Sequence, residues 1–102
     1  MKTVCCGFFT TLANKTRLSI LYTLREGDKS VNQIVQRTGF EQSLVSHNLK
    51  LLKHCSFVDS AVRGKQRIYS LNKKTIIPLF DLVDKHRHAF CKDQDCPVCN
   101  PK

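Results

Sequence analysis

The spacing of apolar residues predicts three helices in the first half of the chain. The opening stripe recurs at three- and four-residue intervals, as on one face of a short helix: Cys5, Phe8, Phe9 and Leu12. A second helix is indicated by TRLSILYTLREG, in which Thr16 can cap the start and Gly27 ends the pattern. Ser30 stands at the cap of a third, shorter helix that ends at Thr38 and Gly39.

Another helix begins two residues after Gly39, so a short helix, a glycine-bearing turn and a longer helix follow one another. This order is typical of a helix-turn-helix. At about 100° per residue, the longer helix, QSLVSHNLKLLKHCSF, has an apolar face of Val45, Leu49 and Leu52 that is expected to pack on the core. Its other face is polar and is predicted to read a DNA major groove through Gln42, Ser43, Ser46, His47 and Lys50.

An ordinary solvated helix face is the alternative interpretation of these polar residues. The preceding helix, the turn and the local positive charge favour the DNA-reading interpretation. His54 falls on the same polar side, where it is solvated or faces phosphate, whereas Cys55 falls toward the core and is expected to be buried.

A β-hairpin is predicted after this helix, because the apolar period changes. FVDSAV and QRIYSL are typical of two short strands, and Gly64 lies in the turn between them. Three cations, Arg63, Lys65 and Arg67, lie at or beside its tip. After a helix-turn-helix, such a hairpin is expected to act as a wing on the phosphate backbone or in the minor groove. A surface hairpin with ordinary cations is the alternative.

A last helix starts near Thr75, a possible cap, and tolerates Pro78 because that residue falls in the first turn. It has two adjacent apolar strips, which make a face wider than a monomer needs: Ile76, Phe80 and Val83, then Leu79, Leu82, His86 and Phe90. The predicted fold class is therefore α+β and mostly helical, a winged helix-turn-helix with a two-stranded wing. We expect one domain over residues 1–90 and a cysteine-rich tail over 91–102.

Charge makes an anionic partner the leading expectation. The 102 residues have a formal net charge of +9. Residues 37–74 contain eight basic and two acidic side chains. Most of the excess positive charge therefore lies in the helix-turn-helix and the wing. This distribution favours double-stranded DNA.

No stretch is long and apolar enough to cross a membrane, and the first residues do not form a secretory signal, so a cytoplasmic protein is expected. In a reducing cytoplasm, the six cysteines are unsuited to three structural disulfides. Metal ligation, redox chemistry or core packing must then account for them.

Three segments together resemble the ArsR/SmtB family of winged-helix repressors: LANKTRLSILYTL, QSLVSHNLKLLKHCSFV and RGKQRIYSL. The resemblance spans about residues 8–90. It departs from the family pattern at Asn48, where the family usually has histidine, and at Ser56, where it has glycine. The first departure is expected to alter base preference and the second to strain the turn into the wing.

The resemblance implies a homodimer in which the first and last helices form the interface and two recognition helices read a near-palindromic operator. It also implies release of DNA when a metal or metalloid binds. Two family sites are incomplete in this sequence. SVNQIVQRTG has no cysteine, and the Asp84-Lys85-His86 pattern lacks its later partners, because Pro97 and Asn100 stand at those positions.

The tail is therefore the best candidate for the ion. Cys91, Cys96 and Cys99 offer three thiols within nine residues, and C-x-x-C spacing lets two sulfurs hold one ion. Thiolates favour soft ions of the zinc, cadmium, lead or arsenite class. Further ligands are expected from this group: His88, Cys5 and Cys6.

Three alternatives for the tail stay open. It is a structural zinc clip, a thiol switch that responds to oxidants or persulfide, or a disordered appendix without function. For the whole protein, the alternative is a winged-helix module without a ligand, which serves as an architectural DNA binder or, with a structural zinc tail, as a protein-docking adaptor. No Ser-His-Asp or paired-carboxylate arrangement indicates an enzyme. The sequence thus predicts a DNA-binding repressor whose operator affinity is lowered by a soft ion.

Overall fold

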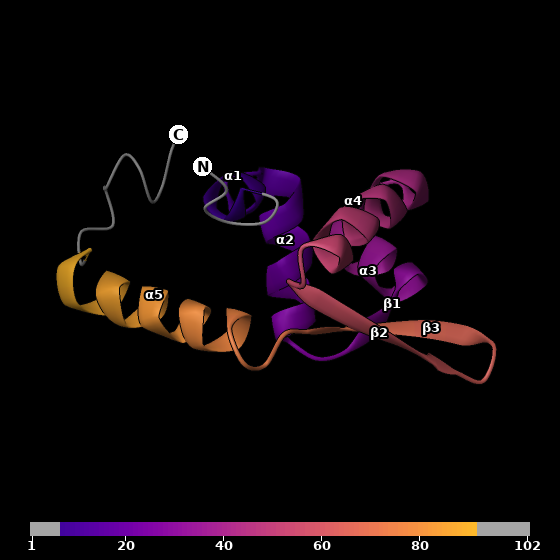
Figure 1. The fold of residues 1–102 in the computed structure, drawn as a ribbon. Coiled ribbons are helices and arrows are strands. Elements are labelled where there is room, and N and C mark those ends of the chain that lie inside the picture. Colours follow the sequence, from indigo (N-terminus) through magenta and orange to yellow (C-terminus); the bar gives the residue numbers. More distant parts are fainter. Residues whose placement is uncertain (1–6, 92–102) are drawn as a thin grey trace. The chain divides into compact units, whose positions relative to one another are not determined.

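The computed structural model describes residues 7–91, and Figure 1 shows the chain as a ribbon. It consists of two compact units, with the boundary between Asn72 and Lys73. The elements are α1 (Phe8–Leu12), α2 (Lys15–Arg25), β1 (Lys29–Ser30), α3 (Val31–Thr38), α4 (Gln42–His54), β2 (Val58–Arg63), β3 (Gln66–Leu71) and α5 (Ile76–Phe90).

The opening stripe is only partly confirmed. α1 has five residues and begins after Gly7, whose φ is 55°. Phe8 packs on Phe57, with ring centroids 4.8 Å apart, whereas Phe9 is 76% exposed. Cys5, the first residue of the stripe, lies outside the described residues.

The start of α2 differs from the prediction. Asn14 is the N-cap, and its side-chain oxygen accepts a hydrogen bond from the Arg17 N–H at 3.0 Å. Thr16, the predicted cap, lies in the first helical turn. Asparagine and threonine both cap helices, so the local sequence alone does not choose between two candidates two residues apart.

The boundaries of α3 are confirmed. Ser30 and Gln33 form a reciprocal capping box: the Ser30 hydroxyl accepts from the Gln33 N–H, and the Gln33 side chain accepts from the Ser30 N–H. The helix ends at Gly39, whose φ of 78° is a left-handed conformation that glycine adopts without a Cβ clash. α4 then begins at Gln42, which completes the predicted helix-turn-helix.

The sheet has three strands, not the two that the sequence indicated. The wing hairpin pairs Val58 with Leu71 at one end and Arg63 with Gln66 at the tip. β1 adds a third, antiparallel strand on the other side of β3, in the order β1-β3-β2. β1 was missed because two residues are too short to show a period-two pattern.

The core of the first unit is made by residues of α2, α3, α4 and the wing segment. Its buried apolar residues are Ile20, Leu21, Leu24, Ile34, Val45, Leu49, Leu52, Phe57, Val58 and Leu71. The predicted apolar face of α4 is confirmed, because its three residues are fully buried. Cys55 was expected to be buried too, but it is the half-buried C-cap of α4, where the helical turn ends.

α5 forms the described part of the second unit. Pro78 lies in its first turn, as predicted, while Thr75 occupies the N-cap position without making a side-chain cap hydrogen bond. Ile76 and Phe80 are buried, but Leu82 is 63% exposed. Within residues 7–91, no helix has the length and apolar character needed to cross a membrane.

Candidate nucleic-acid interface

The polar face of α4 points to solvent opposite the face that is fixed in the core. Gln42, Ser43, His47 and Lys50 are exposed, and Ser46 is half-buried. Because Val45, Leu49 and Leu52 are buried on the other side, the helix cannot rotate to hide these polar groups. The arrangement presents an amide, two hydroxyls, an imidazole and an ammonium group, which are donors and acceptors suited to base edges and phosphates.

Asn48 does not belong to this exposed face. Its side chain is 5% exposed, accepts a hydrogen bond from Arg17 Nε at 3.1 Å, and donates to the Leu44 carbonyl at 2.9 Å. Asn48 therefore does not lie on the exposed polar side of α4, and its effect on base preference stays a prediction. Its hydrogen bond with Arg17 joins α2 to α4.

Ser56 is strained at the entrance to the wing, as the sequence indicated. Its φ is 61°, the only positive φ among the non-glycine residues that the structure describes. The left-handed conformation brings the Ser56 N–H to the Lys53 carbonyl at 3.0 Å, and Asn72 Nδ2 donates to the Ser56 carbonyl at 2.8 Å. These bonds hold the turn that sets the direction of β2.

The wing displays its three predicted cations to solvent. Arg63, Lys65 and Arg67 are exposed around the turn, where Gly64 has a φ of 62°. Arg67 also donates from Nη1 to the Ser60 hydroxyl at 3.3 Å, and Lys53 of α4 donates to the same oxygen at 2.7 Å. Lys53 was not among the predicted DNA contacts, because helical arithmetic puts it between the two faces. Its position in the last turn, directly before the wing, was the available signal.

A surface ion pair fixes the first helix of the helix-turn-helix to α2. Arg37 donates to Glu26 through Nε at 3.1 Å and Nη2 at 2.8 Å, a two-bond contact. This hydrogen bonding, together with the nearby charges of Arg37 and Lys29, holds the pKa of the Glu26 carboxyl below its usual value. The same contact raises the pKa of Arg37. Arg37, one of the eight cations of the central segment, is therefore partly neutralised.

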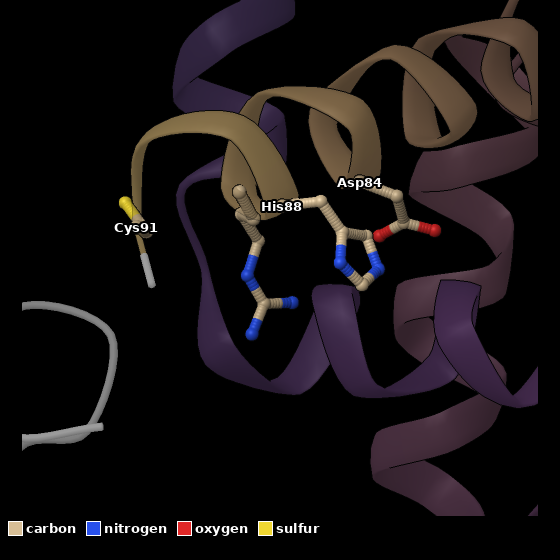
Figure 2. Close-up of a pocket in the computed structure, with 4 residues that line it drawn as sticks. Asp84, His88 and Cys91 are labelled. Atoms are coloured by element: carbon tan, nitrogen blue, oxygen red, sulfur yellow. The ribbon is translucent and has the colours of Figure 1, made fainter. Parts of the chain in front are cut away.

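The C-terminal end of α5 has a hollow of about 410 Å³ that brings together two of the predicted ion ligands, His88 and Cys91, with Asp84 and Arg87. Figure 2 shows the Asp84 and His88 side chains next to each other, one helical turn apart, and the Cys91 sulfur directed away from them. Imidazole, carboxylate and thiolate are ligand types suited to zinc-like ions. Yet the part of the chain that the structure describes contains no group of three such side chains arranged to hold a metal.

The remaining predicted thiol ligands lie outside the described residues: Cys5, Cys6, Cys96 and Cys99. His86, which the sequence pattern placed on an apolar face, lies against Phe90 with ring centroids 5.1 Å apart. Both side chains are exposed, so this contact lies on the surface of α5 and the role of His86 stays a prediction.

Comparisons with known proteins identify the helix-turn-helix. The family model described as "Bacterial regulatory protein, arsR family" matches residues 14–60. The match starts at the N-cap of α2 and ends within β2, so it contains both helices of the motif.

Two curated relatives extend the likeness over more of the chain. The HTH-type transcriptional regulator NmtR of Mycobacterium tuberculosis is 37% identical over 86 residues, which cover 81% of this chain and 72% of that protein. A Streptomyces lividans protein named "Probable mercury resistance operon repressor" is 32% identical over 76 residues, covering 74% of this chain and 61% of that protein.

A solved structure has the same arrangement of elements. The homodimeric winged helix-turn-helix DNA-binding domain of Mb0332 from Mycobacterium bovis is 29% identical and matches with a TM-score of 0.73, covering 86% of this chain and 83% of that one. The winged helix-turn-helix fold is thereby confirmed. The chain belongs to the ArsR family of bacterial regulatory proteins, whose members are DNA-binding transcriptional regulators and not enzymes.

Proposed function

We propose that this regulator is a homodimeric repressor that reads a near-palindromic operator with α4 and the wing, and whose operator affinity falls when its cysteines bind a soft metal or metalloid ion. The exposed polar face of α4, held in place by three fully buried residues, is the observation that supports the DNA-reading part. The family membership and the wing cations point the same way.

The individual DNA contacts follow from side-chain chemistry. Gln42, Ser43, Ser46 and His47 can exchange hydrogen bonds with base edges, and Lys50 can pair with phosphate or with guanine. Arg63 and Lys65 at the tip of the wing suit the phosphate backbone or the minor groove. Arg67, beside the tip of the same hairpin, suits phosphate.

The proposal of a homodimer is supported by large apolar side chains left at the surface. Leu82, Val83 and Phe90 of α5 are exposed, as is Phe9 of α1. Burial of such residues against a second copy would remove apolar surface from water. The Mb0332 domain is described as homodimeric. A two-fold dimer calls for two half-sites, and hence for a near-palindromic operator.

The ion-binding part of the proposal is supported by donor chemistry. His88 and Cys91 line one hollow at the end of α5, and Cys96 and Cys99 follow within eight residues of Cys91 in the sequence. One relative is named for mercury resistance, and mercury is a soft ion that prefers thiolates. Cys5 and Cys6 complete the proposed ligand set.

The DNA-reading face is tested by fluorescence anisotropy on duplex DNA from upstream of the gene, at fixed salt. Lys50→Ala should weaken binding to every sequence, and Ser46→Ala should weaken it in a sequence-dependent way. Lys15→Ala, which removes an exposed cation at the start of α2, is the matched control. Wild-type affinity in both α4 variants would refute the proposed face.

The sensor is tested by titrating the reduced, metal-free DNA complex with Zn(II), Cd(II), Pb(II), Hg(II) or arsenite. The expected loss of affinity is about 5- to 150-fold, a typical coupling between two sites. Cys96→Ser with Cys99→Ser should abolish it, while Cys55→Ser, a thiol change in α4, should not. If ions bind and the DNA stays bound, the ion is structural; release by oxidants or persulfide instead would indicate a redox switch.

A further inference from the structure

Two cations from different elements converge on one hydroxyl where the recognition helix meets the wing. Lys53 Nζ donates to Ser60 Oγ at 2.7 Å, and Arg67 Nη1 donates to the same oxygen at 3.3 Å. The two nitrogens are therefore about 6 Å apart or less, because each lies within one hydrogen bond of that oxygen. All three residues belong to the first unit.

Among the residues that the structure describes, no carboxylate pairs with Lys53 or Arg67. Glu26, at the C-terminal end of α2, forms its ion pairs with Lys29 and Arg37. Asp59, the nearest acidic residue in sequence, accepts a hydrogen bond from the Ser60 N–H at 3.1 Å and pairs with neither cation. Two like charges held this close repel each other unless an anion lies between them.

The spacing suits a single phosphate group. Two oxygens of one phosphate are about 2.5 Å apart, and each can accept a charge-assisted bond of about 2.8 Å, so one phosphate can bridge cations about 6 Å apart. The site also borders the proposed DNA face of α4. Lys53 follows Lys50 by three residues, and side chains at that spacing on a helix are neighbours.

We propose that Lys53, Ser60 and Arg67 form a clamp for one backbone phosphate of DNA, at the junction of the recognition helix and the wing. This inference rests on the proposed DNA-binding function and adds Lys53 and Ser60 to its contacts. The Ser60 hydroxyl keeps both cations in place before DNA arrives. Since one phosphate then touches both elements, the clamp sets the depth of α4 in the groove relative to the backbone.

The clamp is tested by anisotropy over a series of salt concentrations with Lys53→Gln, Arg67→Gln and the double variant. Each phosphate that is neutralised contributes about 0.9 to the slope of log affinity against log salt. The double variant should therefore lose about 0.9 in slope and about 8-fold in affinity at 0.1 M salt, and each single variant only part of this. The affinity of each variant for the operator and for a random duplex should fall by the same factor, because a phosphate contact does not read sequence.

Lys15→Gln is the matched control for the loss of one positive charge, and far-UV circular dichroism checks that each variant is folded. Ser60→Ala should weaken binding without a change in charge, and Ser60→Thr should restore it. Two independent phosphate contacts would instead give a double variant with a slope loss of about 1.8, which would overturn the clamp. The clamp would also be overturned if Lys53→Gln had the same affinity and the same salt slope as Lys15→Gln while the wild-type protein binds DNA. Absence of DNA binding by the wild type would overturn the proposed function itself, and the clamp with it.

Discussion

His47 and Asn48 are neighbours in sequence and have different roles, because one residue of an α-helix turns the side chain by about 100°. His47 is exposed on the proposed DNA face. Asn48 is buried and hydrogen-bonded to Arg17, 31 residues away in sequence. The contact fixes α2 against α4 and so bears on stability, whereas His47 bears on recognition.

Asn48→Ala should lower the free energy of unfolding by about 1–3 kcal/mol, because the Arg17 Nε–H loses its acceptor in a partly buried place. Urea denaturation measures this change. His47→Ala is the paired control: it should leave stability within about 0.5 kcal/mol of wild type and weaken operator binding. The assignment fails if Asn48→Ala is as stable as His47→Ala.

Ser56→Gly should stabilise the protein, although glycine substitutions usually destabilise. A left-handed conformation costs a non-glycine residue about 1–2 kcal/mol, and glycine loses about 0.5–1 kcal/mol more entropy on folding, so the expected net gain is about 0.5–1 kcal/mol. The backbone hydrogen bonds at residue 56 are available to either residue. Thermal melts of Ser56→Gly and Ser56→Ala test this, and a lower melting temperature for the glycine variant would contradict it.

At the scale of the elements, the contact between Glu26 and Arg37 links α2 to α3. The hydrogen bond from Arg37 lowers the pKa of Glu26 in the folded protein. A carboxyl with a depressed folded-state pKa stabilises the fold above its ordinary value of 4.5. That contribution is lost as the pH falls below 4.5 and through the lower folded-state pKa.

Glu26→Gln should therefore reduce stability at pH 7 and make the loss of stability between pH 7 and pH 3 smaller than in the wild type. Both groups are exposed to solvent, so high salt should weaken the effect. Urea midpoints at the two pH values provide the measurement. Asp28→Asn, a change to a nearby exposed carboxyl outside the ion pair, is the control, and equal pH dependence in Glu26→Gln and wild type would refute the linkage.

At the scale of the whole molecule, the exposed apolar residues of α5 are expected to hold two copies together. Leu82→Lys should shift the protein toward monomer, because a charged side chain would be buried in the proposed interface. Sedimentation velocity measures the association, and operator affinity should fall with it, since a monomer contacts one half-site. Lys85→Gln, at an exposed polar position of α5, should leave the dimer unchanged. An unaltered dimer in Leu82→Lys would exclude this face.

The sequence by itself determined the elements whose signals are local. The Ser30 cap, the left-handed Gly39, the two-faced pattern of α4 and the Gly64 turn each depend on a few consecutive residues. Their geometry follows from backbone sterics and from the helical repeat. Residues 42–50 and 63–67 could therefore be assigned to a DNA-facing helix and wing before any tertiary contact was known.

The tertiary structure alone decided which distant residues meet. β1 exists only because β3 supplies its partner, and the burial of Asn48 depends on Arg17 from another helix. Lys53 and Arg67 come together only because the turn at Ser56 folds the wing back toward α4. Such contacts depend on packing between elements, which sequence periodicity does not encode, so they appear only when the chain is folded.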